Sequence, residues 1–237
     1  MADFLLIHGS GHGAWAWRDV IPRLQEFGHE AQAIDLPAHG DDTTPMEAVR
    51  LETYRDAVLS ALGGRTVLVG HSMGGYPITA AAESAPERVA ALVYLCAYVP
   101  KAGMSLADMR RAGPRQPLAP AIRRADDGLS FTFDTTLARE LFYHDCRTEV
   151  VDFATGRLCR QPTLPQETPL AATARAEALP RHYIVCTEDR AVPPEYQETM
   201  SEGFDPACVH RLATSHSPFF AAPDRLARLL NDIAETT

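Results

Sequence analysis

The sequence has few of the features that mark secreted, membrane-spanning or nucleic-acid-binding proteins. Its five cysteines are scattered and none forms a C-x-x-C pair, and no apolar run is long enough to cross a bilayer. Lysine and arginine together number 22 against 31 aspartates and glutamates, so the formal net charge is −9. Nucleic acids and anionic membranes bind basic surfaces, and we therefore expect neither as a partner.

The residues before the first predicted strand and the positions of the cysteines both indicate the cell compartment. No basic region followed by an apolar segment precedes residue 4, so we expect no secretory leader. Cys96 and Cys186 lie inside apolar runs, which is typical of buried free thiols in a reducing compartment. We therefore expect a cytoplasmic protein. The sequence leaves a monomer and a homodimer equally open.

Apolar runs alternate with amphipathic segments along most of the chain. Its 237 residues suit one domain, and a hydrophobic content of 46% is ample for a buried core. The pattern predicts strands at residues 4–7, 31–36, 66–69, 91–96, 183–186 and 208–212, and helices at residues 20–27, 54–62 and 226–233. This alternation indicates an α/β fold with a mainly parallel sheet and helices on both faces.

The alternation stops between residues 100 and 180. This stretch is richer in proline, arginine and glycine, with one clear strand at residues 129–133 and a helix near residues 137–142. Long excursions in compact domains usually have a function, and we predict a cap inserted over the strand ends. The core then comprises residues 1–99 and 181–237. The alternative is an ordered surface insertion without a role.

Residues 70–75 read Gly-His-Ser-Met-Gly-Gly and are the most informative stretch of the chain. They follow an apolar run and precede an alanine-rich segment that is predicted to be a helix. Strand, G-x-S-x-G and helix in this order indicate a nucleophile elbow, in which a sharp turn exposes Ser72 to a catalytic base. Gly70 and Gly74 carry no side chain at the crowded positions of that turn.

Two further strand ends carry the groups that acyl transfer needs. Asp189 follows the strand at 183–186, and His216 follows the strand at 208–212. Because parallel strands bring their carboxyl ends to one edge of the sheet, we expect both residues to lie near Ser72. His216 is the predicted base and Asp189 the acid that orients it. Glu188 is adjacent to Asp189 and remains a competing candidate.

The oxyanion formed during acyl transfer needs two N–H donors. One is predicted to be the backbone of Met73, directly after the nucleophile. The other is expected from the glycine-rich loop at residues 8–13, where the Ser10 N–H is the best candidate.

The same loop permits two other interpretations. Gly9-x-Gly11-x-x-Ala14 after a strand, with Asp35 after the next strand, satisfies a dinucleotide-binding pattern. That interpretation leaves the predicted triad unexplained, and the bulky residues after Ala14 disfavour it. His8 and His12 have the spacing of zinc ligands on a helix, but the glycines between them forbid a helix. We expect no cofactor and no metal.

With these residues placed, the chain resembles α/β-hydrolases of the plant methylesterase and hydroxynitrile lyase group and their bacterial esterase relatives. The resemblance covers the whole length. Its specific points are residues 8–15, 70–75 and 183–189 continuing to 194–197, and it aligns the family's catalytic aspartate with Asp189. Residues 143–146, Tyr-His-Asp-Cys, resemble part of the family's cap helix.

The resemblance implies a serine hydrolase that cleaves a small, largely apolar carboxylic ester through a Ser-His-Asp triad and an acyl-enzyme. It also places Gly9, His12, Tyr143 and Ser217 at the substrate pocket. Lyases of the group carry threonine in place of Gly9 and lysine in place of Ser217, so the sequence favours hydrolysis, with Gly9 leaving space for water. A lyase-type or other non-hydrolytic reaction is the alternative, and a ligand-binding receptor of hydrolase fold is a third possibility.

Overall fold

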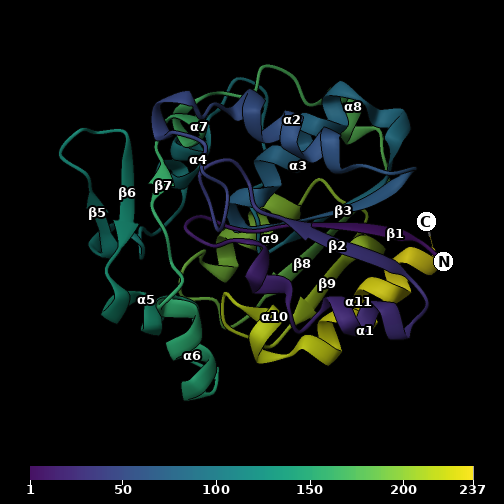
Figure 1. Ribbon diagram of the computed structural model, residues 1–237. Coiled ribbons are helices and arrows are strands. Elements are labelled where there is room, and N and C mark those ends of the chain that lie inside the picture. The colour runs from purple at the N-terminus through teal and green to yellow at the C-terminus, as the bar shows by residue number, and fades with distance from the viewer. Residues whose placement is uncertain (237) are drawn as a thin grey trace.

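A six-stranded parallel sheet forms the centre of the protein (Figure 1). The computed structural model describes residues 1–236. The strand order is β2-β1-β3-β4-β8-β9, and every neighbouring pair is parallel. The strands are β1 (Asp3–Ile7), β2 (Glu30–Ile34), β3 (Thr66–His71), β4 (Val89–Leu95), β8 (Arg181–Cys186) and β9 (Val209–Leu212).

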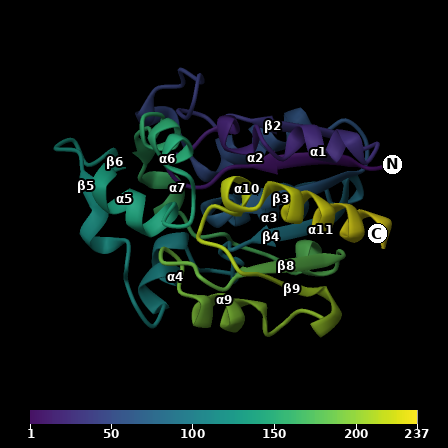
Figure 2. The same cartoon turned by 90° about the horizontal axis from the view of Figure 1, so that it is seen from below.

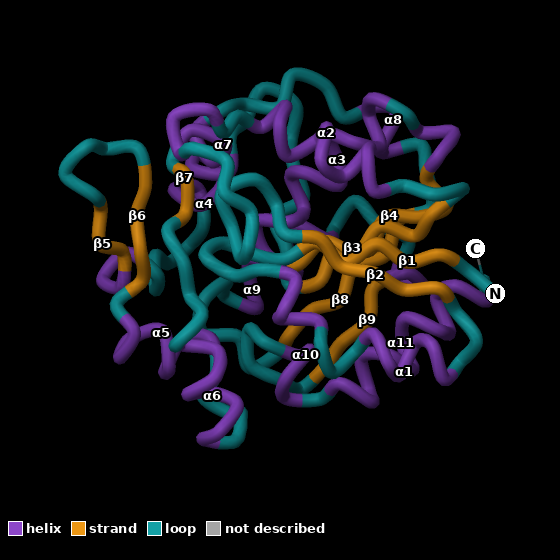
Figure 3. Tube along the Cα trace, in the orientation of Figure 1, coloured by secondary structure: helices purple, strands orange, loops and turns teal. Residues whose placement is uncertain are grey.

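Helices lie on both faces of this sheet (Figure 3). The central strands are buried on both sides, and their sequences are therefore mainly apolar. One face carries α2 (Leu51–Ala61), α3 (Gly75–Ser84), α8 (Ala174–Glu177) and α9 (Pro194–Ser201). The other face carries α1 (Ile21–Glu26), α10 (Pro218–Ala221) and α11 (Pro223–Glu235), of which α1 and α11 lie in front of the strands in Figure 2.

All strands predicted for this sheet are present. The end of β2 differs from the prediction because of a local hydrogen bond. The predicted strand at residues 31–36 stops at Ile34. It stops because the Leu36 N–H donates to His8 Nε2 at 3.1 Å instead of to a strand neighbour. This bond fastens the loop after β1 to the end of β2, at the edge of the sheet where all the carboxyl ends meet.

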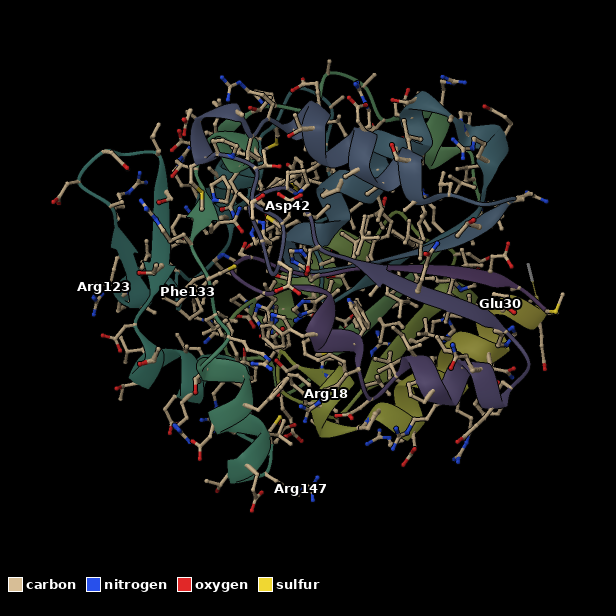
Figure 4. The ribbon with its side chains drawn as sticks, in the orientation of Figure 1. Arg18, Glu30, Asp42, Arg123, Phe133 and Arg147 are labelled. Carbon is tan, nitrogen blue, oxygen red and sulfur yellow. The ribbon has the colours of Figure 1, made fainter. Side chains whose placement is uncertain are left out.

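Residues 96–180, between β4 and β8, form an insertion that lies largely beyond the carboxyl ends of the strands (Figure 1). The insertion contains α4 (Leu106–Ala112), α5 (Thr135–Phe142), α6 (Thr148–Thr155) and α7 (Leu164–Glu167) in addition to α8. It also contains an antiparallel sheet of β5 (Ile122–Arg124), β6 (Ser130–Phe133) and β7 (Gln161–Pro162). In Figure 4, Arg123 marks the outer side of this small sheet.

Two expectations about the insertion need correction. Of its three strands, the apolar pattern predicted only β6, because β5 is largely exposed and β7 is two residues long. Residues 143–146, expected to belong to a cap helix, lie in the turn between α5 and α6. The helix ends at Phe142, and the Cys146 N–H turns back to the Tyr143 carbonyl at 2.9 Å.

Across the described residues, every helix falls short of the length and apolar character needed to traverse a bilayer.

Candidate active site

Ser72 sits on a strained turn between β3 and α3. Its φ of 53° lies in the left-handed region that side chains rarely adopt, and a short 3-10 turn, Ser72–Gly74, leads directly into the helix. A Cβ on Gly70 would stand 2.5 Å from the Gly74 carbonyl oxygen, and a Cβ on Gly74 would stand 2.8 Å from the Ile7 oxygen. The turn therefore requires glycine at both positions, as a nucleophile elbow does.

Asp189 and His216 form a buried pair. Nδ1 of His216 lies 2.6 Å from Oδ2 of Asp189, and both side chains are almost completely inaccessible. Since a carboxylate can only accept, Nδ1 carries the proton and Nε2 keeps the lone pair that a general base needs. Glu188, the competing acid, is exposed and leaves this position to Asp189.

The Asp189 carboxylate is held by four donors in all. Oδ1 accepts the backbone N–H groups of Ala191 at 2.7 Å and Val192 at 2.9 Å, and Oδ2 also accepts Gln197 Nε2 at 2.9 Å. Gln197 lies on α9 and joins the acid to the end of β8 through Cys186 N–H. A carboxylate with this many donors is fixed in position.

The loop before His216 is bonded to the turn between α5 and α6. The Ser215 N–H donates to Asp145 Oδ2 at 2.7 Å, and Ser215 Oγ donates to the Phe142 carbonyl at 3.0 Å. In the same turn, His144 Nε2 donates to the Glu188 carbonyl at 2.9 Å. The insertion is therefore tied to both loops that carry the acid and the predicted base.

Ser72 and His216 line one cavity at the edge of the sheet. Within residues 1–236, Ser72 Oγ makes no hydrogen bond, so its hydroxyl is free to turn toward a base or a substrate. Contacts between nucleophile and base are often long in unliganded enzymes and tighten when substrate binds. The structure thus brings the three residues of the predicted triad to the same place.

The loop at residues 8–13 reaches the same cavity through Ser10. His12 Nδ1 donates to the Ser10 carbonyl at 2.8 Å, and the Tyr143 hydroxyl donates to His12 Nε2 at 2.7 Å. Ser10 Oγ accepts from Gln166 Nε2 at 2.7 Å. These bonds fix the loop from both sides and leave the Ser10 N–H without a protein acceptor among the described residues. Met73 follows Ser72 at the start of α3 and is buried beside it.

Buried histidines surround the site and stay neutral. Burial, together with the nearby His216, lowers the pKa of His12 to about 4 and places the pKa of His71 well below its ordinary value. His71 Nε2 donates to the His216 carbonyl at 2.8 Å, which positions the backbone of the predicted base. Neutral neighbours do not oppose the charge that His216 would acquire in catalysis.

The cavity is small, and the roughly 380 Å³ of empty space around its lining includes space open to solvent. Its wall is mainly apolar away from Ser72, with side chains from the insertion. Figure 4 shows Phe133 on β6, beside the body of the protein. The apolar lining residues are Leu106, Leu118, Phe131, Phe133 and Phe142.

Of the four positions that the resemblance placed at the pocket, His12 lines the cavity directly. Tyr143 lies behind it and supports His12, and Ser217 is buried with its hydroxyl unpartnered among the described residues. A Cβ on Gly9 would stand 2.7 Å from His71 Nδ1 and 3.0 Å from Ser72 Cβ. The missing side chain at Gly9 therefore lets the elbow approach β1; the space expected there for water is occupied by His71.

One group of side chains in the described chain has the spacing of a metal site, namely His71, Cys96 and His216, whose ligand atoms lie within 4.8 Å of one another. Burial raises the pKa of the Cys96 thiol well above its ordinary value, so the thiol keeps its proton. Metal ligation needs the thiolate. His216 is also engaged through Nδ1 with Asp189, and these residues fit an acid–base site better than a metal.

The dinucleotide pattern finds no support in the position of Asp35. Its Oδ1 accepts the Ala14 N–H and its Oδ2 accepts the Asp41 N–H at 3.0 Å. The carboxylate that a ribose would need is thus used to close two loops of the protein.

Sequence reasoning missed three polar residues of the cavity wall, Tyr98, Arg110 and Gln166. Gln166 lies on the four-residue helix α7, which has no sequence signal. Arg110 could have been found from its spacing, because it follows Leu106 by four residues and therefore lies on the same face of α4.

A strained serine elbow, a buried aspartate–histidine pair and an insertion over the strand ends define a hydrolase of the α/β type. The sequence matches the alpha/beta hydrolase family over residues 4–229, and the chain belongs to this family.

Named relatives agree with this assignment. A pyrethroid hydrolase of Sphingobium wenxiniae is 31% identical over 99% of this chain and 88% of its own length. Methylesterase 1 of Arabidopsis thaliana is 31% identical over 98% of this chain and 95% of its own length. The crystal structure of a pyrethroid hydrolase from Sphingobium faniae has a TM-score of 0.89 at 30% identity, covering 99% and 97% of the two chains. The predicted family, fold and class of enzyme, a carboxylic ester hydrolase, are confirmed.

Proposed function

We propose that this protein hydrolyses small, largely apolar carboxylic esters, with Ser72, His216 and Asp189 as the catalytic residues. The observation that carries the proposal is the 2.6 Å bond between His216 Nδ1 and Asp189 Oδ2 beside a serine with a φ of 53°. A structural serine has no need of that strain, and a structural histidine has no need of a buried carboxylate.

The chemistry follows from these positions. Ser72 Oγ attacks the ester carbonyl while His216 Nε2 takes its proton, and Asp189 stabilises the resulting imidazolium. The N–H groups of Ser10 and Met73 hold the oxyanion. His216 then gives the proton to the departing alcohol oxygen. A water molecule, deprotonated by His216, attacks the acyl-enzyme, releasing the acid and restoring Ser72.

Residues 100–180 would act as the cap, since five apolar side chains of this stretch line the cavity around Ser72. We also propose that the protein works in the cytoplasm as a monomer or homodimer. Its five cysteines are all free, which suits a reducing compartment.

Replacing the nucleophile tests the proposal. Ser72→Ala should lower kcat/KM on a short-chain 4-nitrophenyl ester by at least about 10³-fold, because the nucleophile and its base act as a unit. Wild-type protein quenched during turnover should gain the acyl mass on the peptide that contains Ser72. Ester cleavage at the wild-type rate by the variant would mean that another group is the nucleophile.

Two further assays of the wild-type protein distinguish the alternatives that the sequence left open. Release of cyanide from mandelonitrile above the uncatalysed rate would identify lyase activity. Tight ligand binding without turnover of any ester would identify a receptor.

A further inference from the structure

We propose that Arg110 is a specificity residue that binds a negatively charged group of the substrate, so that the preferred substrate is an ester that also carries a carboxylate. Half-esters of short dicarboxylic acids are the simplest compounds of this kind. The inference rests on the proposed function, because it concerns what the ester cavity around Ser72 selects.

The position of Arg110 is built into the fold. It lies in the last turn of α4, whose start is fixed by a capping box between Ser105 and Asp108. Leu106, one turn earlier on the same face, lines the same cavity as Arg110, Ser72 and His216. Among the described lining residues, Arg110 alone carries a permanent charge at neutral pH.

The Arg110 guanidinium makes no hydrogen bond and no ion pair within residues 1–236, although the charge of Glu167 attracts it at longer range. Asp108 and Glu195 are paired with Arg111 and Arg115, and Glu167 lies 4.0 Å from Arg124. The nearby phenol of Tyr98 gives no countercharge, because burial raises its pKa and keeps it protonated.

Arg110 is half-buried, and burial lowers its pKa, which reflects the cost of holding a charge away from water. A protein of net charge −9 has many carboxylates that could have neutralised it. An unpaired guanidinium at the edge of an apolar cavity is instead available to a ligand. Guanidinium groups bind carboxylates through two parallel hydrogen bonds.

The cavity around Ser72 and Arg110 fits a small substrate that carries a negative charge at one end only. The wall around Ser72 is lined by phenylalanine and leucine side chains, which suit a short alkyl or aryl acyl chain. The carboxylate at the far end of that chain would then meet Arg110, while the ester carbonyl lies at Ser72.

The experiment compares monomethyl esters of four- to eight-carbon dicarboxylic acids with the methyl esters of matched monocarboxylic acids. Wild-type protein should prefer the half-ester of one chain length. Arg110→Met should raise KM for that half-ester by about 10–100-fold with little change in kcat, and leave the neutral ester unaffected. Arg110→Lys should recover part of the loss. Arg111→Met is the matched control, since that exposed arginine pairs with Asp108 outside the cavity.

A binding measurement separates this inference from the hydrolytic function. The free dicarboxylate of the preferred length should stabilise wild-type protein against heat, and its neutral diamide should not. Arg110→Met should lose this stabilisation even if no ester is ever cleaved. Equal loss on charged and neutral esters, or equal stabilisation of wild type and variant by the dicarboxylate, would overturn the inference. Failure on every ester with intact dicarboxylate binding would overturn only the hydrolytic function.

Discussion

Replacing the buried carboxylate of Asp189 by an amide should greatly reduce catalysis while the protein stays folded. Asp189→Asn keeps the size of the side chain but lets it donate to His216 Nδ1, which moves the imidazole proton to Nε2. The base then lacks its lone pair, and kcat should fall by about 10⁴-fold. Steady-state kinetics on a 4-nitrophenyl ester measure the loss.

Glu188→Gln is the matched control, because Glu188 is adjacent in sequence yet exposed. It should retain wild-type kcat. A larger loss in Glu188→Gln than in Asp189→Asn would mean that the acid has been assigned to the wrong residue.

Individual site residues could be predicted from the sequence where the chemistry needs one residue type at the end of a strand. Ser72, Asp189 and His216 could be predicted because each follows a strand, and parallel strands end at the same edge. Gln166 could not, because it reaches the cavity from a four-residue helix of an insertion whose path no pattern predicts.

The elbow is an element whose geometry depends on the absence of side chains. Gly70→Ala would place a Cβ 2.5 Å from the Gly74 oxygen, and both atoms belong to a turn that cannot yield without moving Ser72. We expect a loss of about 1–3 kcal/mol in the free energy of unfolding and at least about 10²-fold in kcat/KM. Urea denaturation and ester kinetics measure the two effects.

The same substitution at Gly63 is the control, because no atom lies within 4 Å of a Cβ there. Gly63→Ala should be neutral or slightly stabilising. If both variants behave alike, crowding is not what requires glycine in the elbow.

The elements of the core followed from periodicity, and those of the insertion largely did not. Strands buried on both faces are continuous apolar runs, and α11 shows one apolar face. In the insertion, β7 is two residues long and is held by Gln161, whose side chain bonds to His39 and Tyr54. Such contacts depend on the tertiary fold, which sequence spacing does not reveal.

For the molecule as a whole, buried histidines should make stability depend on pH. Burial lowers the pKa of His8, His12, His39 and His71, with His12 at about 4 against an ordinary value of 6.5. Between these values the unfolded chain binds protons that the native protein does not. The free energy of unfolding should therefore fall as the pH drops from about 6.5 toward 4, by up to about 1.4 kcal/mol per pH unit for each histidine.

Urea denaturation at fixed ionic strength and several pH values measures this slope. His39→Gln removes one of the four groups, and its slope should be smaller than that of wild type. Stability that is constant or increases on acidification over this range would contradict the prediction.

The bonds that join Asp145 to Ser215 and His144 to Glu188 have a consequence for how substrate enters. If the α5–α6 corner swung outward as a gate, it would release the segment immediately before His216 and the carbonyl next to Asp189. The α5–α6 corner therefore could not open while His216 stays aligned for catalysis. Entry is therefore expected at the far side of the insertion, near α4, so that the proton relay stays assembled from one turnover to the next.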